Sequence, residues 1–452
     1  PRQMGFPALR TRQFLLPMLA AGHDVTLATL VDGRAQDAPD GLQERRANTP
    51  SGERAYRSVV VRSDVPGRFL MLRDLRRDTA PDVVVTAGPF LPMAAGARAA
   101  GDEPLWVDVP GDPMSEAQAR SFRSGSTDPI HRYREMLGWA LARGDRFSVI
   151  SDAQRGPLVG ALGLAGRMTA EAMGHELVHV QPGSVEALDD DLGRIEPAPA
   201  ALDALPADAF VVLFCGGYNT WLDDDTMLQG LLRAMERDPS IHFVSTGGAL
   251  RGHEEGTYHR FAGRAAGSPH ADRFHFLGWI PTRALPSVFA RAQVTLFCDL
   301  PCYEAEFGAR TRILESLERG VPVAATDSCD LTHDLRGCAL FHPLPASDAD
   351  AVARSLTDLA GARRSGAPLE AQRDLRPWSL LRERYSLQGT TQPLLRWIDA
   401  PSRSPGGVPI DFLEDYWQEL ARLQDRLEEV WNSPTWKVLG RLHKALSRLR
   451  WG

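Results

Sequence analysis

The sequence contains almost no lysine. Of its 51 basic residues, only Lys437 and Lys444 are lysines, and the other 49 (51 minus 2) are arginines. P-loop nucleotidases, protein kinases and pyridoxal enzymes each depend on a lysine inside the folded protein. Because both lysines lie within the final segment 437–452, the sequence excludes these three classes.

Cysteine is also scarce, and long apolar runs are missing. The five cysteines are odd in number and show no paired metal-site spacing, which favours free thiols in a reducing compartment. No apolar run reaches the roughly 18 residues of a membrane span, and no signal peptide is recognisable. The net charge of −7 is too small to indicate a nucleic-acid partner. We therefore expect a cytoplasmic protein that does not bind nucleic acid.

Short apolar strands alternate with helical segments as far as about residue 400. The predicted strands are 24–30, 82–86, 104–109 and 146–150 in a first unit, and 209–214, 241–245, 273–276, 294–297 and 321–325 in a second. They lack a clean polar alternation, as is typical of parallel strands covered on both faces. The sequence therefore predicts an α/β protein with two Rossmann-like parallel-sheet domains, followed by C-terminal amphipathic helices.

The segment 411–452 differs in kind from the rest. Apolar residues repeat at heptad spacing in two series, Leu413, Leu420 and Leu427, and Tyr416, Leu423 and Val430. Residues 411–432 hold seven acidic residues and two arginines, whereas 433–452 hold five basic residues and no acidic one. The heptads predict a helix that pairs with a partner or with a second copy. The basic half predicts either a helix on a membrane surface or a terminal helix packed on the protein itself.

The string His175-Glu-Leu-Val-His179 matches the H-E-x-x-H of zinc proteases. On a helix the two imidazoles would share one face and one metal. Pro182 follows too closely for the helix to continue, and no third histidine stands at the expected offset. A zinc protease is therefore the least favoured alternative.

Glycine pairs follow two predicted strands of the second unit. Gly216-Gly217 comes after 209–214, and Gly247-Gly248 comes after 241–245. Glycine turns at this edge of a parallel sheet let backbone amides approach a phosphate, although a plain strand-to-helix turn has the same sequence.

Charged residues crowd the loop and helix of 304–315, namely Glu304, Glu306, Arg310, Arg312 and Glu315. Arginine at a helix start opposes the helix dipole, and arginine suits a diphosphate through paired hydrogen bonds. The alternative is a solvated, charged helix face.

Several motifs resemble those of one enzyme family. They are 22–25 (GHDV), 180–185 (VQPGSV), 274–281 (FHFLGWIP), 306–315 (EFGARTRILE) and 320–323 (GVPV). In this order they are similar to the GT-B-fold glycosyltransferases of family 4, and the resemblance covers residues from about 5 to 398. It implies two domains that face a cleft, and transfer of a sugar, with retention, from a nucleotide-diphosphate donor. Neither a metal nor another cofactor is expected.

Proline-rich segments at 180–206 and 399–411 mark the domain limits, and the resemblance implies the role of each domain and of single residues. Residues 1–180 would bind the acceptor, 181–398 would bind the donor, and 399–410 would link to 411–452. Glu306 would hold the sugar, Arg310 and Arg312 would stabilise the leaving diphosphate, and Glu315 would bind the ribose. The other donor-binding residues would be Gly216, Gly217, Tyr218 and Asn219 near the phosphates, and Gly278, Trp279 and Ile280 near the base.

Acceptor candidates come from the first unit. Asp108 and Asp112 leave the carboxyl end of a predicted strand and could orient an acceptor hydroxyl, or could simply form a turn. Gly5 belongs to the glycine loop that the resemblance places at the start of the acceptor domain. Glu306, Arg310 and Asp112 are thus the catalytic candidates. The basic tail favours a glycan or lipid-linked acceptor at the inner face of a bacterial membrane.

Two departures from the family keep a further hypothesis open. The family spaces its donor glutamates eight residues apart, whereas Glu315 lies nine residues after Glu306 and eleven after Glu304. The basic pair that usually follows the first donor strand is also missing. Either glutamate could face the sugar, and a non-catalytic scaffold with a degenerate donor site is the alternative function.

Overall fold

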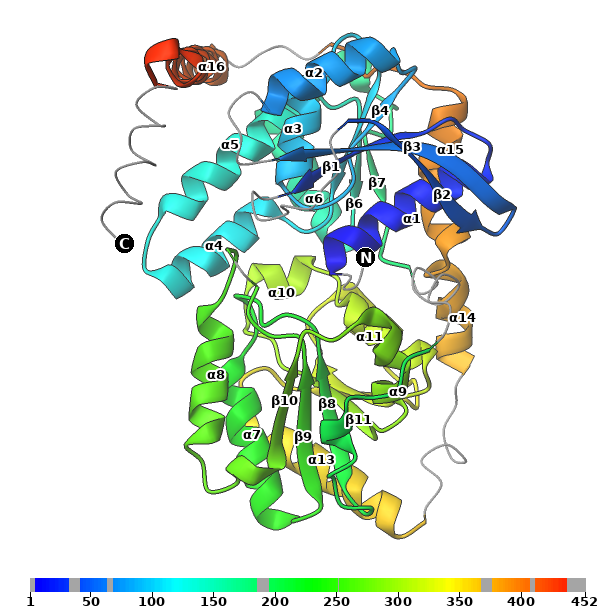
Figure 1. Ribbon diagram of the computed structural model, residues 1–452, viewed down its shortest axis with the longest axis vertical. Coiled ribbons are helices and arrows are strands. Elements are labelled where there is room, and N and C mark those ends of the chain that lie inside the picture. The colour runs from blue at the N-terminus through cyan, green and yellow to red at the C-terminus, as the bar shows by residue number, and fades with distance from the viewer. Residues whose placement is uncertain are drawn as a thin grey trace.

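The computed structural model describes residues 5–31, 41–62, 68–184, 195–250, 252–366, 376–406 and 411–436. The strands form three sheets, of which the two larger are parallel throughout. In Figure 1 the first domain lies above the second, and helices cover the sheets of both. The predicted α/β class with two Rossmann-like domains is confirmed.

The first domain is built around a parallel sheet of four strands. In spatial order these are β4 (Val84–Val85), β5 (Leu105–Val109), β6 (Arg146–Val149) and β7 (Val178–Val180). The helices that pack on it include α3 (Leu91–Ala99), α5 (Asp128–Arg143) and α6 (Asp152–Leu164). Every residue of β5 and β6 is buried, because helices cover both faces of a parallel sheet.

A smaller sheet in the same domain was only partly predicted. β1 (Thr26–Val31) pairs in parallel with β3 (Gly52–Arg62), and β3 pairs antiparallel with β2 (Gln43–Thr49). The sequence analysis found β1 and missed the β2–β3 hairpin. Its turn, Thr49-Pro-Ser-Gly52, carries the glycine at a φ of +98°, so the Pro-Ser-Gly signal was available.

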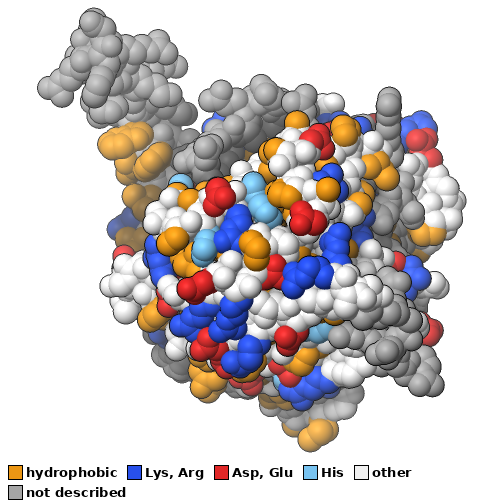
Figure 2. Space-filling view, turned by 90° about the horizontal axis from the view of Figure 1, so that it is seen from below, with side chains coloured by type: hydrophobic (Ala, Val, Ile, Leu, Met, Phe, Trp, Pro, Cys, Tyr) orange, Lys and Arg blue, Asp and Glu red, His pale blue; other side chains and the backbone are white. Residues whose placement is uncertain are grey.

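The second domain has six parallel strands. Their spatial order is β10 (Phe274–Gly278), β9 (Ile241–Thr246), β8 (Phe210–Cys215), β11 (Val294–Phe297), β12 (Val323–Thr326) and β13 (Phe341–Leu344). All five predicted strands are present, and β13 is added. The face of this domain farthest from the first mixes acidic and basic side chains (Figure 2), so its coloured surface offers no broad area of one charge.

The His175–His179 string does not form a helix. Residues 174–177 are irregular, and β7 begins at Val178, so the two histidines do not face one metal. His179 instead stacks on Trp106 with ring centroids 5.1 Å apart. No group of three or more His, Cys, Asp or Glu side chains able to hold a metal occurs within the described ranges. The zinc-protease alternative is therefore wrong in its geometry.

The chain returns from the second domain to the first. Helices α14 (Arg376–Arg384) and α15 (Leu387–Asp399) follow the second sheet, and α15 packs against α1 (Phe6–Ala20) of the first domain (Figure 1). Leu394 and Trp397 share a buried cluster with Phe14 and Trp106. Part of the range 181–398 therefore packs on the first domain.

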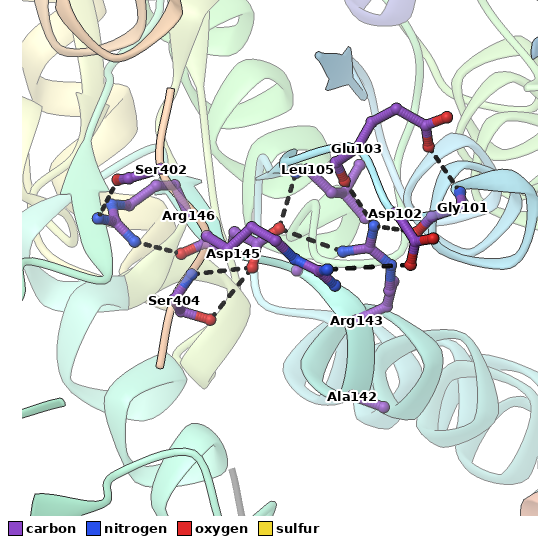
Figure 3. Close-up of polar contacts among 12 residues, drawn as sticks. Gly101, Asp102, Glu103, Leu105, Ala142, Arg143, Asp145, Arg146, Ser402 and Ser404 are labelled. Carbon is purple, nitrogen blue, oxygen red and sulfur yellow. Dashed lines mark hydrogen bonds and ion pairs between the residues drawn. The ribbon is translucent and has the colours of Figure 1, made fainter. Parts of the chain in front are cut away.

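The segment after α15 is fastened to the amino end of the first parallel sheet (Figure 3). Asp145, which is buried, accepts hydrogen bonds from the Ser404 backbone N–H at 2.9 Å and from Arg143 Nη1 at 3.1 Å. Arg146 Nη2 donates to Ser402 Oγ at 2.9 Å. These contacts fix the start of the segment predicted as a linker, 399–410, against the first domain.

The last described helix is α16 (Asp411–Asn432), which agrees with the heptad prediction for 411–432. It lies on the first domain, at the end remote from the second (Figure 1), and Gln424 Nε2 donates to Glu135 Oε1 of α5 at 3.4 Å. The basic segment was predicted over 433–452, and its residues 437–452 lie outside the described residues. Within the described chain, no helix is long and apolar enough to cross a membrane.

Candidate active site

A small pocket lies where the strand order of the second sheet reverses. The chain passes from β8 outward through β9 and β10, then returns to the other side of β8 at β11. Ligands of open α/β sheets bind at the carboxyl ends of the strands at such a point. The pocket is lined by Gly217, Asn219, Trp221, Leu222, Phe297, Asp299, Arg310 and Arg312. The structure thus brings the predicted glycine turn and both predicted arginines to one site.

Glycines stand at the carboxyl ends of three strands beside this site. Gly216, Gly247 and Gly278 end β8, β9 and β10 at φ angles of +115°, +89° and +65°, which favour glycine. The Gly247 N–H donates to Gly278 O at 2.7 Å. A Cβ on Gly247 would lie 2.2 Å from Gly216 O, so only glycine lets these turns approach one another.

Arg312 is the cation most available to a ligand. It lies on α11 (Thr311–Glu318), half-buried, with its guanidinium carbon 5.2 Å from the Phe214 ring centroid and 5.4 Å from that of Phe297. Its Nη2 lies 3.4 Å from Gly217 O, and no described carboxylate forms an ion pair with it. Burial lowers the pKa of Arg312, yet arginine stays charged at neutral pH. The Arg312 guanidinium is therefore able to bind an anionic ligand.

Arg310 is neutralised within the protein. Its Nε donates to Asp299 Oδ2 at 2.5 Å, and its Nη2 donates to Glu304 O at 3.1 Å. Burial works against the charged form, but Asp299 and its other neighbours outweigh burial and raise the pKa of Arg310. The prediction that Arg310 shares the diphosphate charge with Arg312 is therefore not supported, because its charge already has a buried partner.

Two predicted donor-binding side chains belong to the core instead. Tyr218 is fully buried, and its hydroxyl lies 2.9 Å from Ser245 Oγ. Ile280 packs in an apolar cluster with Leu213 and Val288. Neither side chain reaches the pocket, although Asn219, which is partly exposed, does.

The predicted base residue lies at a strand end, and the predicted ribose residue lies on helix α11. Trp279 follows β10, is 39% exposed, and donates from Nε1 to Ala249 O at 3.2 Å. Glu315 lies on α11 with a carboxylate oxygen 3.4 Å from Arg319 Nη2. An exposed indole beside a glycine turn is able to stack on a flat ring.

Glu304 and Glu306 differ sharply in environment. Both lie on α10 (Tyr303–Phe307), where Glu306 is exposed and Glu304 is 5% exposed. Glu304 Oε2 accepts a hydrogen bond of 3.1 Å from Ser115 Oγ of the first domain. Burial, and then the nearby Glu116 carboxylate, raise the pKa of Glu304 well above its usual range. Glu304 therefore lies buried in the interface between the two domains, whereas the predicted Glu306 faces solvent.

The acceptor candidates divide in the same way. Asp108 is fully buried, with Oδ1 2.7 Å from Arg10 Nη2 and Oδ2 2.9 Å from Arg10 Nε. Ser148 Oγ also donates to it, at 2.7 Å, so the prediction that Asp108 orients an acceptor is not supported. Asp112 is only partly buried and caps α4 (Pro113–Ser124) beside Glu304. Gly5 precedes α1 and is exposed, and Figure 1 shows this end of α1 facing the second domain.

The sequence analysis missed the contacts that α4 makes with the second domain. Arg123 Nε donates to Thr220 O at 2.9 Å, and its Nη2 donates to Leu222 O at 2.6 Å. Arg120 Nη2 donates to His253 O at 3.0 Å. The only signal was the polar face formed by residues 116, 120 and 123, which is also typical of a solvated helix. Through Arg123, the first domain holds the loop that lines the pocket.

No model of a protein family and no curated protein matches this chain. Its structure is similar to a sucrose-phosphate synthase from Thermosynechococcus elongatus, with a TM-score of 0.62 and 18% identity over 88% of this chain and 94% of that one. It is also similar to an α,α-trehalose-phosphate synthase (UDP-forming) from Burkholderia vietnamiensis, with a TM-score of 0.58 and 15% identity over 88% and 94%. HepE from Anabaena, in complex with UDP, gives 0.58 and 14% over 88% and 98%. At these identities the likeness shows the fold alone, and the chain has the GT-B fold of these proteins.

Proposed function

We propose that the chain is a family 4-type glycosyltransferase that moves a sugar from a nucleoside-diphosphate donor to a glycan or lipid-linked acceptor. The observation that carries the proposal is the position of Arg312. This half-buried arginine lacks a described carboxylate partner and borders a pocket at the switch point of a parallel sheet. A diphosphate satisfies such a cation through charge-assisted hydrogen bonds. HepE, of the same fold, was solved with UDP-glucose, which supports a nucleotide-sugar ligand.

The donor extends across the neighbouring strand ends in this proposal. Arg312 and the backbone around Gly216 bind the diphosphate, and Arg312 stabilises the charge that builds on it as the sugar leaves. Trp279 borders the base, and Glu315 binds the ribose hydroxyls. Arg310 acts indirectly, since its pair with Asp299 shapes the pocket wall.

The sugar lies toward the first domain in this proposal. Of the two glutamates, we assign its contact to Glu304, because that carboxyl lies between the domains near Asp112 and Ser115. Asp112 is the acceptor-side carboxylate. Retention of the anomeric configuration and independence of a metal are implied by the family resemblance; product analysis tests the first, and activity in the presence of a chelator tests the second.

Binding of nucleotides to the whole chain tests the proposal. UDP, GDP, dTDP, ADP and CMP are compared by calorimetry and by thermal unfolding, and one of them should bind. Arg312→Gln should then weaken binding by roughly 10- to 150-fold, because a hydrogen bond to a charged group contributes about 1.5–3 kcal/mol. The matched control is Arg264→Gln on α8 (Gly256–Ala266), which breaks an exposed pair with Asp225 of α7 (Asp224–Arg237).

The outcomes separate the enzyme from the scaffold. If the wild-type chain binds a nucleotide and slowly hydrolyses its sugar donor, the transferase is supported. If no nucleotide binds, the proposal fails and the non-catalytic GT-B scaffold replaces it. Binding that Arg312→Gln leaves unchanged would show that the donor lies elsewhere.

A further inference from the structure

Helix α10 of the second domain lies directly below α4 of the first (Figure 1), and the contact between them buries a carboxyl group from each domain. Glu116 of α4 is 3% exposed and Glu304 of α10 is 5% exposed. Burying a carboxylate costs several kcal/mol unless a positive charge and hydrogen bonds offset it. The groups around these two side chains therefore decide whether both of them can be ionised.

The charge of Glu116 is offset by its neighbours. His253, in the loop after β9, has its Nε2 3.0 Å from Glu116 Oε1. Arg120, one turn after Glu116 on α4, has its Nη1 3.4 Å from His253 Nδ1. Because arginine can only donate, Nδ1 accepts, and the proton of the neutral ring lies on Nε2, toward Glu116. Glu116 and Arg120 are thus linked through this histidine as one negative and one positive charge.

Glu304 has no comparable partner. It forms no ion pair with any described residue, and the nearby Arg310 is already paired with Asp299 at 2.5 Å. With Glu304 neutral, the positive and negative charges buried around it cancel. With Glu304 ionised, one uncompensated negative charge would lie in the contact beside Glu116, and such a charge is costly to bury.

The other titratable groups around α10 add no positive charge. Asp112 of α4 faces Glu304 and is itself acidic. Asp152 of α6, which also packs on α10, is exposed and pairs with Arg384 at 2.9 Å. Burial raises the pKa of the Cys302 thiol, which therefore stays neutral. The surroundings of Glu304 thus favour its uncharged form.

Hydrogen bonding leads to the same conclusion. Within the described chain, one donor serves the Glu304 carboxyl group, namely Ser115 Oγ at 3.1 Å from Oε2. This hydroxyl also lies 3.0 Å from Asp112 O, so its one hydrogen has two acceptors. An ionised carboxylate has about four lone-pair sites to satisfy. The raised pKa of Glu304, caused by burial and then by Glu116, agrees with this shortage of donors.

We propose that Glu304 is a carboxylic acid while α4 contacts α10, and that its proton makes this contact between the domains a pH-sensitive switch. When the contact opens, water reaches Glu304 and the carboxyl ionises, so closing takes up one proton from solvent. The closed contact is most stable below the ordinary pKa of 4.5. Its stability falls about tenfold for each pH unit above that value and levels off at the raised pKa.

The switch acts on the candidate donor site through α4. Arg123 of this helix binds the carbonyl oxygens of Thr220 and Leu222, and Leu222 lines the pocket. Opening of the contact removes these bonds from the pocket wall. As regulation of nucleotide binding the inference rests on the proposed function, whereas the pH dependence of the contact itself does not.

Pulsed electron paramagnetic resonance on the full chain without ligand tests the switch. Spin labels are attached at Gln118→Cys on α4 and His259→Cys on α8, two exposed positions in opposite domains. The background is Cys302→Ser, because the other four cysteines are buried. The distance distribution then gives the ratio of closed to open molecules. Between about pH 5 and pH 7 this ratio should fall about tenfold per pH unit.

Substitutions at three positions assign the proton. Glu304→Gln keeps the shape of the neutral acid and cannot ionise, so the labelled variant should stay closed over this pH range. Glu306→Gln, exposed on the same helix, is the matched control and should keep the pH dependence of the parent. Glu116→Gln removes the neighbouring charge and should reduce the fall without abolishing it, because burial still raises the pKa of Glu304.

Two results would overturn the switch. One is a ratio of closed to open molecules that does not change with pH in the parent. The other is a Glu304→Gln variant with the same pH dependence as the parent, which would assign the proton to another group. If Glu304→Gln does not fold, as judged by circular dichroism, the comparison of Glu116→Gln with Glu306→Gln decides, since equal pH dependence in these two excludes a proton held between the carboxyl groups. No nucleotide is used, so the result is independent of the test of nucleotide binding.

Discussion

Replacing Asp108 with alanine should destabilise the first domain by about 3–5 kcal/mol, the usual cost of breaking a buried ion pair by removing one partner. Arg10 and Asp108 both have fully buried side chains. Without the carboxylate, the acceptors that Arg10 keeps among the described residues are Gln13 Oε1 at 2.8 Å and Pro182 O at 3.2 Å. The Gly88 N–H, 3.2 Å from Asp108 Oδ2, also loses its acceptor. The substitution therefore leaves a buried charge with neutral partners only.

The magnitude converts into a measurable melting shift. A domain of this size loses about 2–4 °C per kcal/mol, so the midpoint should fall by about 6–20 °C. Calorimetry measures the fall in the melting temperature, and urea unfolding followed by circular dichroism measures the loss in the free energy of unfolding. Asp24→Ala is the matched control, because Asp24 pairs with Arg57 at 3.1 Å on the surface, where such pairs contribute about 0–1 kcal/mol.

A second variant separates charge burial from loss of packing. Arg10→Met combined with Asp108→Leu removes both charges and keeps the volume, and buried pairs replaced in this way often lose no stability. The double variant should recover most of the loss of Asp108→Ala. If Asp108→Ala costs less than about 1 kcal/mol, Arg10 finds solvent or another acceptor, and the buried-charge reasoning is refuted.

Substitutions at three further positions probe the candidate site and the contacts between the domains. Arg123→Gln should raise the nucleotide dissociation constant about tenfold by freeing the loop carbonyls that Arg123 binds, and Arg123→Lys should recover part of it in calorimetric titration. Because the pKa of Glu304 is raised in the folded protein, its contribution to stability is greatest below pH 4.5 and falls as the pH rises toward that raised value. Glu304→Gln should flatten this decline in a series of melting curves. Gly247→Ala should abolish nucleotide binding and lower the melting temperature, since its Cβ would collide with Gly216 O.

The parallel sheets could be predicted from the sequence because a fully buried strand is recognisable from its own residues. β8 and β9 are buried at every position, so their sequences are continuous apolar runs bounded by glycine turns. The same turns predicted a ligand site at the strand ends. By contrast, β2 is mostly exposed and carries charged residues, so its sequence contains no apolar run that would predict a strand.

The roles of single charged residues could not be predicted, because they depend on partners distant in the sequence. Asp108 and Asp112 read alike as turn residues, yet Asp108 meets Arg10, 98 residues away. Glu304 and Glu306 are two residues apart, and only the packing of α10 on α4 decides which is buried. The sequence shows which charges are present, whereas the tertiary fold decides which of them remain available.

The return of α15 to the first domain makes that domain discontinuous. Its core is completed by Leu394 and Trp397, and the amino end of its parallel sheet by the Asp145 contact with Ser404. A fragment that stops at residue 184 would leave Phe14 and Trp106 without these partners, so the first domain should not be separable by a single cut. Since the main chain crosses between the domains twice, we expect their relative motion to be hinge-like bending about the two crossings.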